Sequence, residues 1–152
     1  MSAPDRTARI RREAGRLCLA LGWTPLHEVR LPDGRRADIL ALKPDGGLVC
    51  IEIKSGVADF VADRKWQDYR AFSDALYFAV DDAFPQALLP EETGLIVACD
   101  VAEILREPVA HPIAPARRRI MLLRFAQLAG ARLAGFEDPA GVSALRALGR
   151  VE

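Results

Sequence analysis

The chain has 152 residues, of which 51% are hydrophobic and 28% are charged, and its formal net charge at pH 7 is zero. This composition predicts one folded domain over residues 1–152, and it excludes both a disordered chain and a protein that is basic throughout. No apolar run approaches the roughly 18 residues of a membrane-spanning helix, and the basic N-terminus lacks the apolar segment of a signal peptide. We therefore expect no membrane partner.

The first half of the sequence predicts a helix followed by three antiparallel strands. Apolar residues recur at helical spacing between residues 4 and 22, and Gly22 stands where a C-terminal cap belongs. Two turns that contain Pro-Asp-Gly, LPDGRR at 31–36 and KPDGG at 43–47, divide the following segment into short runs. These runs predict a β-meander with strands at about 25–31, 36–42 and 48–54.

The second half predicts another helix, three more strands and a long final helix. After Gly56 the pattern is helical to about residue 73. Three strands follow, at about 75–80, 93–99 and 101–105. A proline-containing loop then leads to a helix at about 115–134, and residues 135–152 form a peripheral tail with one short helix at 140–148. The order α-β-β-β-α-β-β-β-α predicts an α/β fold in which a mixed β-sheet is flanked by helices.

The distribution of charge and the cysteines constrain the partners and the compartment. Basic side chains exceed acidic ones by four over residues 1–36, whereas acidic side chains exceed basic ones by six over residues 81–107. This asymmetry permits a local nucleic-acid-binding face on a protein of zero net charge. Cys18, Cys50 and Cys99 have no C-x-x-C spacing, which predicts reduced core thiols instead of disulfides or a zinc site. We therefore expect a cytoplasmic protein, associated with the nucleoid when it binds DNA.

The stretch LVCIEIKSG at 48–56 is an apolar strand that carries two charges near its end. Alternation places Glu52 and Lys54 on the same face of this strand. One interpretation is a solvated edge with a surface ion pair, which needs no function. The other interpretation starts from Asp38, the acidic residue of the preceding strand. An antiparallel register about the turn pairs residue 38 with a residue near 52 or 53, so Asp38 and Glu52 could face the same side of the sheet.

Two carboxylates that converge on one place repel each other, and a hard divalent cation relieves the repulsion. Mg²⁺ prefers one or two carboxylates together with waters and phosphate oxygens, and Mn²⁺ is the expected substitute. Lys54 would then lie beside a metal-bound water or a scissile phosphate. The group predicts metal-dependent hydrolysis of a phosphodiester, with Asp38 and Glu52 as metal ligands and Lys54 as the catalytic cation.

Asp38, thirteen intervening residues and Glu52-Ile53-Lys54 resemble the signature of the PD-(D/E)-x-K nuclease superfamily. That resemblance implies a restriction-endonuclease-like fold, with the Ile53 backbone carbonyl as a candidate third metal ligand. Over nearly the whole chain, segments such as RADILAL and HPIAPARRRIMLLRFAQLA are similar to the bacterial MmcB-type DNA repair proteins, which implies a role in DNA repair or damage tolerance. Ala37 departs from the superfamily pattern at the proline position, and the Q-x-x-x-Y motif of some relatives has no match at Gln67.

Two functions are compatible with these residues. The first is a Mg²⁺-dependent DNA nuclease that acts in DNA repair or damage tolerance, which the intact carboxylates and lysine favour because keeping them partly buried costs stability. The second is a DNA-binding or adaptor protein that uses the same fold without cleavage. The short chain and its zero net charge favour a further partner, such as another DNA repair protein, that supplies targeting.

Several other residues are candidates for the site or for DNA contact. Glu13 on the first helix is either an additional metal ligand or a solvated carboxylate among neighbouring arginines. Trp66 is expected in the core. Three consecutive arginines open the last helix, where positive charge opposes the helix dipole, so they indicate either an anionic partner or a solvated helix end. The candidate DNA-binding residues are Arg35, Arg36, Lys65, Gln67, Arg117, Arg118 and Arg119.

Overall fold

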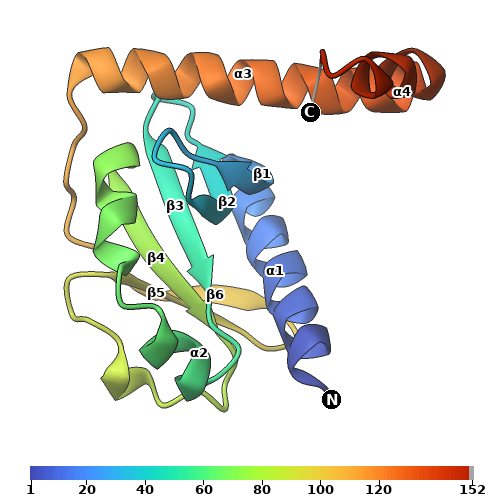
Figure 1. Cartoon of the computed structure of the whole chain (residues 1–152). Helices are drawn as coiled ribbons and strands as arrows, with labels where there is room; N and C mark the ends of the chain where they lie inside the picture. The colour runs from blue at the N-terminus through green and yellow to red at the C-terminus, as the bar shows by residue number, and fades with distance from the viewer. Residues whose placement is uncertain (151–152) are drawn as a thin grey trace. The chain divides into compact units, whose positions relative to one another are not determined.

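The structure is a computed structural model that describes residues 1–150 (Figure 1). The α-helices are α1 (Ala3–Ala20), α2 (Val57–Ala62), α3 (Pro115–Glu137) and α4 (Pro139–Ala147). The 3₁₀-helices are η1 (Trp66–Phe72) and η2 (Gln86–Leu88). The strands are β1 (Thr24–Arg30), β2 (Arg36–Leu42), β3 (Leu48–Ile53), β4 (Ala75–Val80), β5 (Gly94–Ala98) and β6 (Ala102–Arg106). This order confirms the predicted mixed α/β class.

Contacts within the chain group its residues into two compact units. The first unit, Met1–Ile113, contains the whole sheet with α1, α2, η1 and η2. The second unit begins at Ala114 and contains α3 and α4. The tail expected from residue 135 onward falls on the end of α3 and on α4, and its last two residues lie outside the described part of the chain. The single domain expected from the length stays a prediction.

Local sequence signals set the ends of α1 and the first two turns. Ser2 and Asp5 form a capping box at the start of α1, and Gly22 follows its end with a φ of +77°. The two Pro-Asp-Gly turns place Gly34 and Gly46 at φ values of +88° and +87°, where a side chain would strain the backbone. The predicted helix cap and both tight reversals are therefore present.

The sheet has six strands in the order β1-β2-β3-β4-β5-β6. Strand β3 pairs in parallel with β4, and β4 with β5, whereas the other three pairs are antiparallel. The β3 strand is therefore interior, and all six of its residues are buried. This placement contradicts the solvated-edge interpretation of the stretch LVCIEIKSG, because a strand with a neighbour on each side and helices over the sheet has no exposed face.

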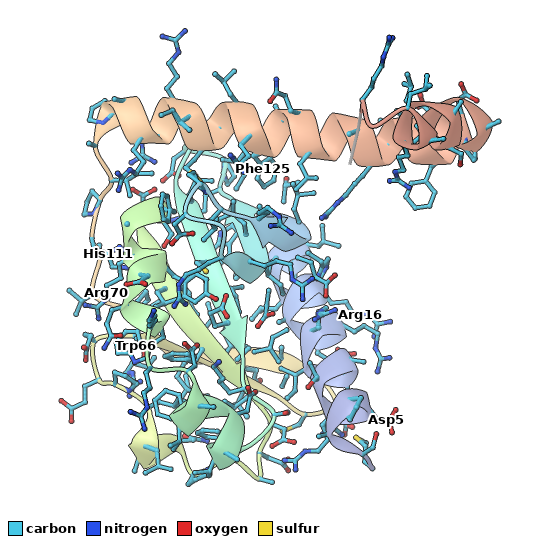
Figure 2. The ribbon with its side chains drawn as sticks, in the orientation of Figure 1. Asp5, Arg16, Trp66, Arg70, His111 and Phe125 are labelled. Carbon is cyan, nitrogen blue, oxygen red and sulfur yellow. The ribbon has the colours of Figure 1, made fainter. Side chains whose placement is uncertain are left out.

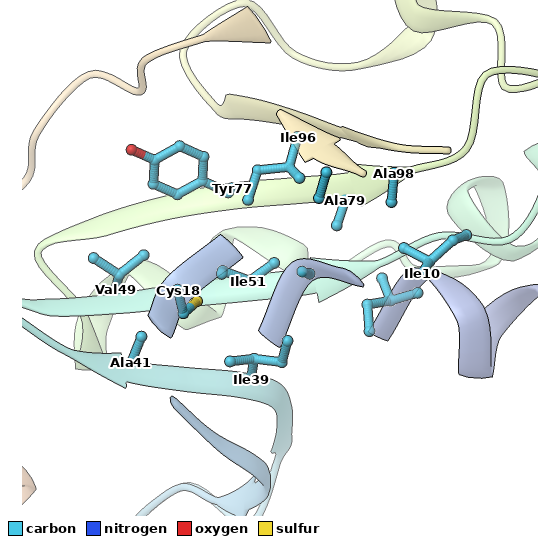
Figure 3. Packing of buried hydrophobic residues seen from close by; sticks show 13 residues of the cluster. Ile10, Cys18, Ile39, Ala41, Val49, Ile51, Tyr77, Ala79, Ile96 and Ala98 are labelled. Atoms are coloured by element: carbon cyan, nitrogen blue, oxygen red, sulfur yellow. The ribbon is translucent and has the colours of Figure 1, made fainter. Parts of the chain in front are cut away.

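Helix α1 covers one face of the sheet through a continuous apolar core (Figure 3). Ile10 and Cys18 of α1 belong to one buried cluster with strand residues that include Ile39, Ile51 and Ile96. Ile10, Ile39, Ile51 and Ile96 are fully buried. Because this helix also carries residues toward the candidate site, its docking fixes part of the site geometry.

The segment after Gly56 differs from the continuous helix predicted to residue 73. It forms α2, a break at Asp63 to Lys65, and then η1. The side chain of Asp63 explains the break. It accepts a hydrogen bond from the Lys65 N–H and forms an ion pair with Lys54, and these contacts hold the chain out of a continuous helix. In η1 the buried residues Trp66, Tyr69 and Phe72 recur every third position, which matches the three-residue turn of a 3₁₀-helix. Trp66 is in the core, as expected.

Replacement of Ile10 by alanine tests how strongly α1 is held on the sheet. Ile10 is fully buried in the core cluster, so Ile10→Ala should lower the free energy of unfolding by about 2–5 kcal/mol through lost burial and a cavity. Leu19 on the same helix is 65% exposed, and Leu19→Ala should change it by less than about 0.5 kcal/mol. Urea denaturation of both variants measures the difference, and equal effects would contradict the packing described for α1.

Candidate active site

Asp38, Glu52 and Lys54 lie in one pocket with a volume of about 630 Å³. The pocket is walled by the first half of α1, by the ends of β2 and β3, and by α2 with η1. Besides the three signature residues, its charged and polar lining consists of Thr7, Arg11, Arg36, Ser55, Asp59, Asp63 and Tyr69. The sequence-predicted carboxylates and lysine are therefore brought together, as the antiparallel register about the turn indicated.

The two carboxylates form hydrogen bonds between strands β2 and β3. The regular backbone pairing of β2 with β3 ends at Ile39 and Ile51. Beyond that point the Asp38 N–H donates to Glu52 Oε1 at 3.1 Å, and the Ile53 N–H donates to Asp38 Oδ2 at 2.8 Å. Each carboxylate thus accepts a backbone hydrogen bond from the strand that carries the other. These bonds fix both side chains at the point where the backbone pairing of β2 with β3 ends.

Burial acts against the charge of these two acids. Glu52 is only 3% exposed, and burial, followed by the nearby Asp38 charge, raises the pKa of its carboxyl to about 8. Burial also raises the pKa of Asp38, although the Ile53 N–H, Lys54 and Arg11 favour its charged form. Without a cation, ionising both carboxylates therefore costs free energy. A divalent metal ion would offset this cost and would be bound by the same oxygen atoms.

Lys54 has a carboxylate partner of its own. Its Nζ lies 2.9 Å from Asp63 Oδ2, and the side chains of Lys54 and Asp63 are 7% and 16% exposed. Asp63 stands at the break between α2 and η1, so the 3₁₀ segment and the lysine are fixed by the same side chain. The ammonium is held inside the pocket as a charged, preorganised group.

The remaining candidates are distributed between the pocket and the surface. Arg36 is exposed and lines the pocket, whereas the Arg35 guanidinium pairs with Asp68 at 3.2 Å and lies over the Tyr69 ring. Lys65 and Gln67 are exposed and do not line the pocket. Arg117, Arg118 and Arg119 belong to the first turns of α3 in the second unit.

Glu13 is not the solvated carboxylate that one of its two interpretations described. It is 7% exposed instead of solvated, and its Oε1 accepts from Arg12 at 3.2 Å and from Arg16 at 2.9 Å. Arg16 itself extends from α1 with most of its side chain in solvent (Figure 2). Glu13 does not line the pocket of Asp38 and Glu52, so the structure does not bring it to the predicted ligands. Its role as an additional metal ligand stays a prediction without support from the geometry.

Sequence reasoning did not identify several residues of the pocket lining, among them Tyr69, Asp63 and Arg11. Tyr69 lies in the segment predicted as a helix, and its hydroxyl donates to the Arg36 carbonyl oxygen at 3.4 Å. Asp63 carries no local signal, because its role depends on contact with Lys54. Arg11 could have been found, since Thr7 and Arg11 are four residues apart on one face of the predicted helix, and both line the pocket.

The geometry also defines what the pocket can bind. Among residues 1–150, no group of three or more His, Cys, Asp and Glu side chains is arranged to hold a metal ion. Of the four carboxylates in the lining, Asp63 pairs with Lys54, and Asp38 and Glu52 form the predicted donor pair beside Ile53, whose backbone carbonyl is the candidate third ligand. That set suits Mg²⁺, which keeps several waters, better than it suits zinc.

The six-stranded sheet with this pocket defines a mixed α/β protein with a carboxylate and lysine site at the ends of β2 and β3. The family model described as DNA repair protein MmcB-like matches residues 1–140. The chain therefore belongs to the MmcB-like DNA repair protein family, which assigns it a role in DNA repair. This confirms the resemblance found in the sequence.

Comparison with solved structures gives one close likeness. The SPO1766 protein of unknown function from Silicibacter pomeroyi is 40% identical, with a TM-score of 0.85 over 90% of this chain and 94% of that chain. A repair endonuclease from Pyrococcus abyssi is 13% identical, with a TM-score of 0.30 over 49% of this chain and 37% of that chain, which is too low to bear on function. No curated protein matches the chain. Within residues 1–150, no helix is both long enough and apolar enough to cross a membrane.

The raised pKa of Glu52 predicts how stability depends on pH without metal. The folded state keeps the Glu52 proton up to about pH 8, whereas an unfolded glutamate loses it near 4.5. Between these values the folded state binds more protons, so the free energy of unfolding should fall as the pH rises from about 4.5 to about 8. Urea titrations in chelator should show this decline in the wild type and a weaker one in Glu52→Gln. Equal slopes would contradict the burial of an ionisable Glu52.

Proposed function

We propose that this protein is a Mg²⁺-dependent DNA nuclease that hydrolyses phosphodiester bonds in DNA repair. The observation that carries the proposal is the reciprocal anchoring of Asp38 and Glu52 in one pocket with the buried Lys54. A pair of acids of which Glu52 is buried and Asp38 is partly buried lowers stability, and the geometry keeps the pair together and adds a lysine instead of separating the charges. Membership in a DNA repair family makes DNA the expected substrate.

The residues present fit a bound Mg²⁺ ion. Asp38 and Glu52 would hold it, with the Ile53 carbonyl as a candidate third protein ligand and Mn²⁺ as the expected substitute. When bound, the ion supplies polarisation of the phosphoryl group and a more acidic water. Burial is the main cause of the raised pKa of Glu52 and the nearby Asp38 charge adds to it, and a bound cation would favour the charged form of both carboxylates.

The protein's own residues would orient and stabilise the substrate. The Lys54 ammonium lies in the same pocket as the two carboxylates, where it would stabilise the negative charge that grows on the phosphoryl oxygens. Asp63 holds Nζ in place before the substrate arrives, so little reorganisation of this charge is needed. Arg36 is exposed at the pocket and is available to a neighbouring phosphate of the strand.

A second candidate function is DNA binding without cleavage, as an adaptor in a repair complex. One observation favours it, because the 2.9 Å ion pair with Asp63 neutralises Lys54. If that pair persists with DNA bound, Lys54 does not reach a scissile phosphate. Asp63 would then be structural, and the pocket would be a binding surface only.

Two substitutions separate the carboxylate and lysine roles. Asp38→Asn should abolish cleavage and Mn²⁺ binding while the metal-free protein remains at least as stable, because one of two repelling charges is removed and the amide oxygen can still accept from Ile53. Lys54→Met should retain Mn²⁺ binding and lose about two to three orders of magnitude in cleavage rate, the loss typical of one electrostatic transition-state contact. Labelled single-stranded, nicked, flapped and duplex DNAs with Mg²⁺, Mn²⁺ or chelator provide the assay, beside calorimetric titration and melting curves.

Asp82→Asn provides the matched control, since Asp82 is an exposed acid outside the pocket lining. It should cleave as the wild type does. DNA binding without cleavage of any substrate under any metal condition would favour the adaptor function. Equal Mn²⁺ binding by the wild type and Asp38→Asn would contradict the metal site.

A further inference from the structure

Arg11 reaches the site from α1 and is held there by a residue of the edge strand β1. Arg11 lines the same pocket as Asp38, Glu52 and Lys54. Its Nη1 lies 3.3 Å from Glu28 Oε1, and the two side chains are 31% and 42% exposed. A guanidinium next to two acids would be expected to pair with them, yet the ion pair observed for Arg11 is with Glu28, on the far side from β3.

The backbone at Glu28 is in an unusual conformation. Within residues 1–150, Glu28 is the one non-glycine residue with a positive φ, at +52°. The β1–β2 register has pairs at His27 with Ile39 and at Val29 with Ala37, so Glu28 falls opposite Asp38. A left-handed conformation of a residue with a side chain costs free energy, and such residues cluster at functional sites. Here the unusual residue lies between the two register pairs that flank Asp38 on the neighbouring strand, and its side chain is the partner of Arg11.

Arg11 also has hydrogen-bonding capacity that the protein does not use. Its Nε is buried and has no hydrogen-bond partner among the described residues. A guanidinium has five N–H donors in a planar fork, which matches the oxygens of a phosphate group. A buried N–H without a partner costs free energy, so a ligand oxygen that paired with it would be favoured.

The pocket has more acidic than basic side chains, so Arg11 is one of the few cations in it that could offset the charge of a phosphate. Its lining includes four acids, Asp38, Glu52, Asp59 and Asp63, and Asp63 already pairs with Lys54. A DNA strand that enters is itself anionic, so a cation other than Lys54 is needed to offset its phosphates. Arg11 and Arg36 are the basic residues of the lining that remain.

We propose that Arg11 binds a phosphate of the DNA strand in this pocket and that Glu28 is its positioning residue. This inference rests on the proposed function for its substrate, because the phosphate belongs to the strand that Asp38, Glu52 and Lys54 act on. The Glu28 carboxylate takes one terminal nitrogen of the guanidinium and directs the remaining donors toward the pocket. The left-handed backbone conformation at Glu28 is the one in which its side chain contacts Arg11 from the edge strand.

The test compares charge-neutral variants in DNA binding and in cleavage. Arg11→Gln should weaken binding of a labelled single-stranded oligonucleotide in chelator by about 10- to 100-fold, the range for loss of a charge-assisted hydrogen bond. Arg11→Lys should recover part of the loss, since charge returns without the planar fork. Arg12→Gln removes the same charge from the next residue, which lies outside the lining and leaves Glu13 with Arg16, so it is the control and should change binding by less than about 3-fold.

Variants of Glu28 separate its carboxylate from its backbone. Glu28→Gly permits a φ of +52° without strain and removes the carboxylate, so the melting temperature should not fall, whereas KM for cleavage should rise by about 3- to 10-fold with a smaller change in kcat. Glu28→Gln should raise KM in the same way. A structural role alone would lower the melting temperature and leave KM unchanged.

The outcomes distinguish this inference from the proposed function. If the wild type cleaves DNA and Arg11→Gln binds and cleaves as Arg12→Gln does, the assignment of Arg11 is overturned and the nuclease stands. If no protein cleaves but Arg11→Gln alone loses DNA binding, the phosphate contact stands and the nuclease is overturned. A wild type that neither binds nor cleaves DNA overturns both.

Discussion

The last hydrogen bonds between β2 and β3 are made by carboxylates instead of backbone carbonyls, and the site depends on this exchange. Asp38 Oδ2 accepts from the Ile53 N–H, and Glu52 Oε1 accepts from the Asp38 N–H. The two acids are therefore part of the strand pairing and cannot move apart without breaking it. The position of the pocket follows, because the backbone pairing of the two strands stops at Ile39 and Ile51.

Keeping two acids in a partly desolvated place costs stability, and the surrounding elements limit that cost. Lys54 and Arg11 favour the charged form of Asp38, and each of these cations is held by an acid from another element, Asp63 or Glu28. Helix α1, which brings Arg11, is itself fixed by Ile10 in the apolar core. The apolar core, the break after α2 and the edge strand β1 thus together determine the positions of Arg11 and Lys54 near Asp38.

The strands and their register could be predicted because the signals are local. Alternation and the two Pro-Asp-Gly turns determine β1, β2 and β3, and the same register brings Asp38 to Glu52. The break at Asp63 could not be predicted in this way, since it depends on contact with Lys54 across the pocket. The sequence left open whether the charged face of β3 is solvated, because its burial depends on strand and helix neighbours that are distant in sequence. The burial of Glu13 was missed, although the arginines that pair with it, Arg12 and Arg16, are its neighbours in the sequence.

The most direct test of the account is the anomalous scattering of Mn²⁺ in crystals of the protein. The account predicts one strong peak in the pocket, at about 2.0–2.3 Å from oxygens of both Asp38 and Glu52, and no peak there in crystals of Asp38→Asn. A peak on the Ile53 carbonyl side would identify the third ligand. Saturating Mn²⁺ with no peak between the two carboxylates would contradict the claim that this pocket is a metal-dependent active site.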